Sequence, residues 1–231
     1  MLIATQGLVL HTTPYAESSV VAKVFTRHLG VRSYIIKGVR GKTGRVKQNL
    51  LQPLSSLDMV VYDNHRNSLN YIKEMSPRRP QQVSEPVGNA LRFFMTEVLY
   101  KALHEEEPMQ ELWDYVEQEC EASGEERGNV PIVFMLRVAQ YLGIRPLDNY
   151  SRREQYFDLQ EGHFVDKATE TTLSPALSEL LHEYLSEEGF RERSLQRRTE
   201  LLNALIAYYQ LHLSGFNHFT SHEILHMVLR S

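Results

Sequence analysis

The residues best suited to chemistry in this chain are a run of cations that follows an expected strand. The segment Gly30–Pro53 reads GVRSYIIKGVRGKTGRVKQNLLQP and contains no acidic residue, although the chain is acidic overall. Glycines separate the cations, which favours a backbone that can follow a chain of phosphates. Lys and Arg bind phosphate by charge and do not read base sequence. The segment predicts a nucleic-acid site, with a merely solvated loop as the alternative.

The candidate DNA contacts are the basic side chains in and next to this segment. We expect most phosphate contacts from Lys37, Arg40, Lys42, Arg45 and Lys47, with Arg32 and Lys23 at the margin. Aromatic side chains that would be able to stack on bases are Tyr15, Phe25, Tyr34, Tyr62 and Tyr71. A small barrel fills its interior with its own aromatic residues, so we expect most of these five in the core.

A second motif, His222-Glu223-Ile224-Leu225-His226, matches the H-E-x-x-H pattern of zinc hydrolases. Two histidines one helical turn apart can bind zinc, and the glutamate between them can act as a general base. Thr220 and Glu223 also have the spacing of a capping box, which gives the glutamate a structural role, and a third ligand is missing nearby. We therefore expect no metal, no cofactor and no catalytic residue, and keep a zinc-dependent hydrolase as the alternative.

Cysteine content and hydropathy narrow the class of protein further. Cys120 is the only cysteine, which excludes an internal disulfide and any multi-cysteine zinc site. No apolar run is long enough to span a membrane, and the N-terminus lacks the basic start of a signal peptide. The sequence predicts a cytoplasmic protein without a membrane partner.

The distribution of charge predicts two domains with different partners. Residues 1–80 contain 12 Lys or Arg and 4 Asp or Glu, a net charge of +8, whereas residues 81–231 contain 13 and 25, a net charge of −12. A basic first part suits nucleic acid, and an acidic second part suits proteins.

The elements that must position these residues change in type near residue 76. Before it, alternating apolar residues predict five strands at about 3–11, 19–26, 31–39, 57–62 and 69–75, with the first turn at Thr13-Pro14. Five short strands with one longer connection fit a β-barrel of the OB type. The expected fold is α+β: an OB barrel at 1–76, a Pro-rich linker at 77–87, and a helical domain at 88–231.

The second part shows helical periodicity. Helices are expected at about 89–104, 108–122, 130–142, 174–187, 198–213 and 221–230, with a β-hairpin insertion at about 154–166. The helix at 108–122 is expected to be amphipathic, with Leu112, Tyr115, Val116 and Glu119 roughly along one side. The helix at 130–142 is apolar almost all round, which is typical of a buried helix.

The order PYxESSxVxxVFTxxxG, then KGVRG, then LLQPL, resembles the N-terminal half of the RecO family of bacterial recombination mediators. The matching residues are Pro14, Glu17, Ser18, Phe25, Thr26, Gly30, Lys37, Gly38, Arg40, Gln52 and Pro53. The second half agrees more loosely, in a helix that ends in Tyr-Leu-Gly and in a terminal Ser-Gly-Phe. Many members carry a four-cysteine zinc site after that helix, where this chain has YFDLQEGHFV and no cysteine.

The resemblance implies binding of single- and double-stranded DNA and annealing of complementary strands. It also implies loading of the recombinase RecA, assisted by RecR, onto strands coated by single-stranded-DNA-binding protein. The acidic, apolar-ended tail of that protein would need a cation beside an apolar groove, for which Arg137, Arg197 and Arg198 are the candidates. A barrel that only docks proteins is the remaining alternative.

Overall fold

The computed structural model describes residues 1–39, 48–64, 69–79, 85–104, 107–120, 128–186 and 194–230. The chain divides into two compact units, Met1–Ser123 and Gly124–Ser231. The first holds the barrel and two helices, and the second holds helices and a small hairpin. The expected fold class, an OB-type barrel followed by a helical region, is confirmed.

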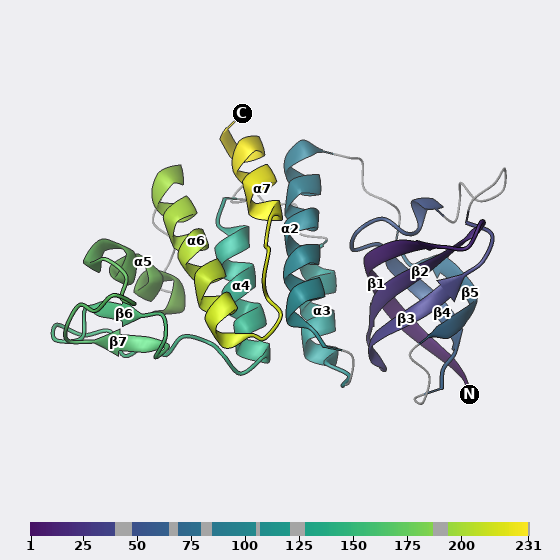
Figure 1. Cartoon of the computed structure of the whole chain (residues 1–231), viewed down its shortest axis with the longest axis horizontal. Coiled ribbons are helices and arrows are strands. Elements are labelled where there is room, and N and C mark those ends of the chain that lie inside the picture. Colours follow the sequence, from purple (N-terminus) through teal and green to yellow (C-terminus); the bar gives the residue numbers. More distant parts are fainter. Residues whose placement is uncertain are drawn as a thin grey trace. The chain divides into compact units, whose positions relative to one another are not determined.

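Five strands of the first unit form a closed barrel in the order β1-β2-β3-β5-β4 (Figure 1). Their bounds are Leu2–Tyr15 for β1, Ser19–Thr26 for β2, Gly30–Ile36 for β3, Ser56–Tyr62 for β4 and Asn70–Pro77 for β5. All neighbouring strands are antiparallel except β3 and β5, which are parallel. The parallel pair closes the barrel through Tyr34↔Asn70 and Ile35↔Tyr71.

Alternation along β2 shows why these residues form a barrel strand. Val20, Ala22 and Val24 belong to the buried core cluster. The residues between them, including Lys23, point to the opposite face of the strand, because side chains alternate along a strand. The alternating apolar residues that predict the strand are therefore also the residues that fill the barrel interior.

The first strand is longer than predicted, and the turn expected at Thr13-Pro14 is wrong. β1 continues through Pro14, which pairs with Val20, and the turn follows at Ala16, whose φ is 54°. β1 pairs with β4 only from Leu2 to Leu8, so its later part has a partner strand on one side alone. Proline is tolerated in a strand at such an edge, because no ladder hydrogen bond is lost there.

Two helices of the first unit follow the barrel: α2 at Pro86–Ala102 and α3 at Gln110–Glu119. α3 buries Leu112, Trp113, Val116 and Glu117. Of the residues expected along one side of this helix, Leu112 and Val116 are buried, and Tyr115 and Glu119 are partly exposed. The indole Nε1 of Trp113 donates a hydrogen bond of 3.0 Å to the backbone carbonyl oxygen of Phe25 in β2.

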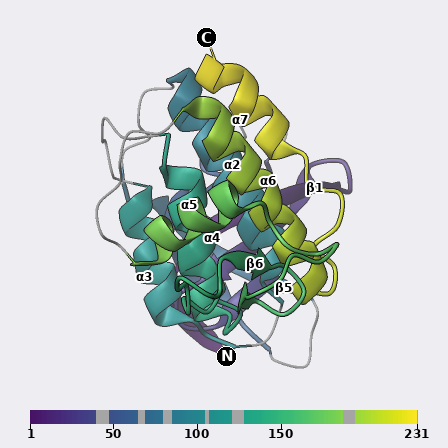
Figure 2. The same cartoon turned by 90° about the vertical axis from the view of Figure 1, so that its left-hand side faces the viewer.

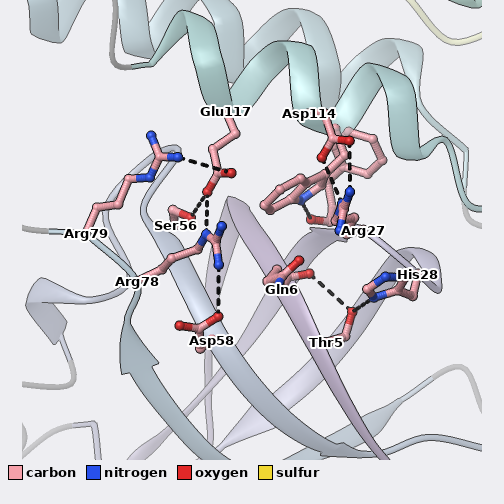
Figure 3. Close-up of polar contacts among 12 residues, drawn as sticks. Thr5, Gln6, Arg27, His28, Ser56, Asp58, Arg78, Arg79, Asp114 and Glu117 are labelled. Carbon is pink, nitrogen blue, oxygen red and sulfur yellow. Dashed lines mark hydrogen bonds and ion pairs between the residues drawn. The ribbon is translucent and has the colours of Figure 1, made fainter.

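Ion pairs reinforce the contact between α3 and the barrel (Figure 3). Arg27 binds Asp114 through Nε at 2.8 Å and through Nη2 at 3.0 Å. This hydrogen-bonded pairing raises the pKa of Arg27 above its ordinary value. Such two-point guanidinium–carboxylate contacts fix orientation as well as distance.

The second set of ion pairs surrounds the buried carboxylate of Glu117 (Figure 3). It accepts hydrogen bonds from Ser56 Oγ at 2.7 Å and Arg78 Nε at 2.9 Å, and Arg79 Nη2 lies 3.3 Å from it. Arg78 and Arg79 begin the segment expected to be a linker, so its first residues contact α3. The expected division into domains at 1–76, 77–87 and 88–231 stays a prediction. The two compact units of the structure divide later in the chain, after Ser123.

The second unit contains four helices and a hairpin among its described residues. Their bounds are Val130–Tyr141 for α4, Tyr156–Asp158 for β6, His163–Val165 for β7, Pro175–Ser186 for α5, Leu195–His212 for α6 and Ser221–Arg230 for α7. α6 packs against α4 and α5, which lie together in Figure 2. α4 is buried along most of its length, as its apolar sequence predicts.

The hairpin of β6 and β7 is held by packing and by one carboxylate. Phe157 and Phe164 are fully buried and meet edge to face, with ring centroids 5.1 Å apart. The chain turns at Gly162, whose φ of 74° favours glycine. Asp158 accepts hydrogen bonds from Thr171 Oγ1 at 2.8 Å and Thr169 Oγ1 at 3.0 Å, and also from two backbone N–H groups of the turn.

Candidate nucleic-acid interface

A groove of about 970 Å³ lies on the barrel where β3 and β5 diverge. The pairing of the two strands ends at Ile35↔Tyr71, and residues that follow this pair on both strands line the groove. The lining residues are Ile35, Ile36, Lys37, Leu50, Tyr62, Tyr71, Ile72, Lys73, Glu74 and Met75. The groove is thus formed by β3, the end of β4, β5 and the segment before β4.

Two tyrosines form one wall of this groove. Tyr62 of β4 and Tyr71 of β5 stand directly opposite each other in the antiparallel register. Directly opposed side chains lie on the same face of a sheet with their Cβ atoms about 5 Å apart. Tyr62 is 51% exposed and Tyr71 is 46% exposed, so both rings are available to a ligand.

Lysines stand beside the tyrosines. The Nζ atom of Lys37 lies over the ring of Tyr71, 5.5 Å from its centroid. Lys73 occupies the position of the register shift between β4 and β5, and its Nζ lies 3.3 Å from the carboxylate of Glu74. The groove therefore combines apolar side chains, exposed rings and cations, which is the combination that binds single-stranded nucleic acid.

Four of the other predicted DNA contacts cannot be placed relative to the groove. Arg40, Lys42, Arg45 and Lys47 lie outside the described residues, between Lys37 and Leu50, which both line the groove.

The two marginal cations are engaged inside the first unit. Lys23 points away from the barrel interior, and its Nζ lies 4.8 Å from the ring centroid of Tyr100 in α2. Arg32 Nε lies 3.7 Å from the buried carboxylate of Asp63. The structure does not bring these two side chains into the lining of the groove. Their contact with DNA stays a prediction.

The five aromatic candidates separate by burial. Tyr34 is buried in the barrel core, and burial together with the carboxylate of Asp63 raises its pKa. Phe25 is also buried, but it lies on the opposite face of β2 from the core residue Val24. Tyr15, Tyr62 and Tyr71 are exposed, and of these only the last two line the groove.

Sequence reasoning missed the pairing of Tyr62 with Tyr71 and the presence of Lys73 in the lining of the same groove. The two tyrosines are the last exposed ring of one expected strand and the first of the next, a spacing typical of a hairpin pair. That signal was present in the sequence. The sequence does not indicate that apolar residues of β3 line the same groove, because the parallel pairing of β3 with β5 joins distant parts of the chain.

The H-E-x-x-H motif lies on α7, at the start of the helix. The rings of His222 and His226 meet edge to face with centroids 5.8 Å apart, and Glu223 is exposed. The backbone N–H of Glu223 donates to the carbonyl oxygen of Thr220 at 3.1 Å, so the helix begins where the capping pattern predicts. Within the described ranges, no group of three or more His, Cys, Asp or Glu is placed to hold a metal ion. The absence of a metal stays a prediction.

Two further observations concern Cys120 and membranes. Burial raises the pKa of the Cys120 thiol to about 12, which makes a role as a nucleophile unfavourable. In the part of the chain that the structure describes, no helix is both long and apolar enough to cross a membrane.

The fold places this protein in the class of proteins that have an OB-type barrel followed by a helical region. The family model "Recombination protein O N terminal" matches residues 1–81. The chain is 30% identical over 241 residues to DNA repair protein RecO of a Porphyromonas gingivalis strain, covering 97% of this chain and 98% of the relative. Identity to DNA repair protein RecO of Bacteroides fragilis is 30% over 244 residues, with the same coverage. The chain is also 27% identical over 240 residues to DNA repair protein RecO of Christiangramia forsetii, and the match covers 99% of each chain.

This chain belongs to the RecO family. Its function therefore lies in DNA repair and recombination, and the family expected from the N-terminal motifs is confirmed.

Proposed function

We propose that this protein is a non-enzymatic recombination mediator that binds DNA along the groove of its barrel. The observation that carries the proposal is the meeting of Lys37 with Tyr71 and Tyr62 in one groove, at the root of the basic segment. Lys37 begins a stretch that supplies Arg40, Lys42, Arg45 and Lys47. The phosphates would pair with these cations, and the bases would lie in the groove.

Strand annealing follows from the same charge. Two complementary strands repel each other through their phosphates, and a dense group of cations screens that repulsion when both strands lie on one surface. Binding by charge carries no sequence information, which suits a protein that acts on any broken chromosome. Such binding would place the protein in the cytoplasm, at the nucleoid.

A salt series tests the proposal. If roughly five phosphates are neutralised, the logarithm of the binding constant for single-stranded DNA falls with the logarithm of salt concentration with a slope near −3.5. Changing Lys37, Arg40, Lys42, Arg45 and Lys47 together to Ala removes most of that slope and abolishes annealing. The control changes Arg152, Arg153 and Lys167, exposed cations of the second unit, and leaves the slope intact. A folded five-site variant with the original slope would place the DNA site elsewhere.

Membership of the RecO family supports a wider set of partners. We infer that RecR and the single-stranded-DNA-binding protein assist this chain in loading RecA, which it meets indirectly. The C-terminal tail of the single-stranded-DNA-binding protein would contact Arg137, Arg197 or Arg198 of the second unit. A pull-down with tail-deleted partner protein tests this: equal recovery of intact and tail-deleted protein contradicts it.

A further inference from the structure

We propose that Tyr62 and Tyr71 form a platform on which unpaired bases stack, so that the groove takes single-stranded and not duplex DNA. This inference rests on the proposed function, because it assumes that the groove contacts DNA. It assigns the two rings a task that the basic residues cannot perform, which is to distinguish a single strand from a duplex.

The rings are placed as a platform by the strands that carry them. Opposed positions of β4 and β5 hold the two side chains on one face, and the strands fix their spacing. Tyr34 and Phe25 of the same barrel are buried, whereas about half of each groove tyrosine is exposed. A base has a flat face of similar size to a tyrosine ring and stacks on it whatever its identity.

The remainder of the groove favours bases over phosphates. Leu50, Ile72 and Met75, which are partly buried, supply apolar surface to the lining, whereas Ile35 and Ile36 are buried and contribute little. Contact between this apolar surface and the apolar faces of bases is favourable, because it removes both from water. Contact with a charged phosphate is unfavourable, because the phosphate loses its hydration. In duplex DNA the base faces are stacked on one another inside the helix. A duplex can therefore offer phosphates, sugars and base edges to this surface, but no base faces along its length.

Lys37 connects the platform to the cationic segment. Its ammonium group lies over the Tyr71 ring at 5.5 Å, a contact held by the attraction of a cation to the face of an aromatic ring. A base that stacks on this face displaces the ammonium group, which can then pair with the phosphate of the same strand. Base and phosphate are thus bound together by one lysine–tyrosine pair.

Selectivity for unpaired bases also gives a direction to annealing. A base that pairs with a complementary strand becomes stacked inside the new duplex and is no longer available to the tyrosines. The duplex product therefore loses the contacts made by the platform and keeps only those made by charge. Release of the annealed product becomes easier than release of the single strand.

The experiment uses the full chain and three labelled DNA probes with equal numbers of phosphates. These are a single-stranded oligothymidylate, an abasic single strand and a fully paired duplex without a loop. Tyr62→Leu and Tyr71→Leu each keep an apolar side chain and lose the ring, whereas the corresponding Phe variants keep the ring. Tyr15→Leu is the matched control, since Tyr15 is 47% exposed and does not line the groove.

Each Leu variant is expected to lower affinity for oligothymidylate by roughly fivefold or more, the effect of losing one stacked base. The Phe variants and Tyr15→Leu keep the affinity of the unchanged protein. Affinity for the abasic strand and the duplex is unchanged in all variants, and so is the salt slope, because no phosphate contact is lost. Thermal melting confirms that each variant is folded.

Two results would overturn the platform. One is an unchanged affinity for oligothymidylate in the double Leu variant, the outcome expected if an extended peptide occupies the groove. The other is an equal loss on the abasic strand. In both cases a reduced salt slope in Lys37→Ala would leave the proposed function intact. If neither the lysine nor the tyrosine changes alter binding, the groove is not the DNA site and both proposals fail.

Discussion

The indole Nε1 of Trp113 in α3 donates its hydrogen bond to the backbone carbonyl oxygen of Phe25 in β2, 88 residues earlier in the chain. Both residues are buried. A strand of the barrel thereby has a hydrogen-bond partner on a helix. α3 is part of the structure that stabilises the barrel.

Replacement of Trp113 should therefore destabilise the first unit. Trp113→Phe keeps a ring but leaves the Phe25 carbonyl without this donor, which costs about 1–3 kcal/mol. Trp113→Ala also leaves a cavity and costs about 3–5 kcal/mol. Urea unfolding followed by circular dichroism measures both, because Trp113 is the only tryptophan and its fluorescence is lost. Phe93→Leu, on the exposed side of α2, is the control. A loss no larger than that of the control would contradict the role given to Trp113.

Asp158 should make the hairpin of the second unit sensitive to acid. Burial alone raises the pKa of a carboxyl group, but hydrogen bonds from Thr171, from two backbone N–H groups and from Thr169 lower the pKa of Asp158 below its ordinary value of 3.8. Because the folded pKa is lowered, the stabilisation is complete above the ordinary pKa and is lost as the pH falls through the folded pKa.

We expect Asp158→Ala to cost about 1–3 kcal/mol at pH 7, and the difference from the unchanged protein to shrink as the pH falls below 3.8. Urea unfolding at a series of pH values measures this difference. Asp166→Ala is a control, since Asp166 is exposed and lies 3.8 Å from Arg153. A difference that stays constant down to the lowest pH would exclude the carboxylate as its source.

Cys120 should resist alkylation in the folded protein. With its pKa raised to about 12 by burial, the thiol is almost entirely protonated at pH 8, and the thiolate is the reactive form. Iodoacetamide should label it more slowly than an ordinary cysteine, because a smaller fraction of the thiol is present as thiolate. Mass spectrometry of native and urea-unfolded protein provides the comparison. Equal labelling in both states would refute the prediction.

Removal of metal should change neither melting temperature nor DNA annealing. The hairpin is held by Phe157, Phe164 and Asp158, and the HEILH helix supplies two histidines without a third ligand among the described residues. Incubation with a chelator, followed by thermal melting and an annealing assay, tests this. Stoichiometric zinc in protein purified without a histidine tag, or peptidase activity that Glu223→Gln abolishes, would favour the hydrolase alternative.

The barrel was predictable because its strands carry their information locally. Val20, Ala22 and Val24 alternate with outward residues, and this period identifies both the strand and its inner face. α3 was harder, because Leu112 and Val116 fit two neighbouring helix faces. The choice between Tyr115 and Trp113 as the third buried residue is made by Phe25, whose position no local pattern reveals.

The candidate site was predictable only in part for the same reason. The basic segment is visible in the sequence, since charge needs no fold to be counted. The groove requires the parallel pairing of β3 with β5, and Arg32 turns toward Asp63 because both lie in the barrel. Tyr71 gains its place beside Lys37 from that pairing and not from its neighbours in the chain.

The two-pair junction of β3 and β5 has a consequence for the stability of the barrel itself. It has the fewest paired residues of the five junctions in the ring, so local opening should begin there. The groove lies over this junction and has lining residues from both strands. A ligand in the groove contacts both sides of the junction and, by binding only the closed form, lowers the population of the open one. Occupancy of the groove and closure of the barrel are therefore thermodynamically linked, and backbone amides at Ile35 and Tyr71 would exchange their hydrogens more slowly when the groove is filled.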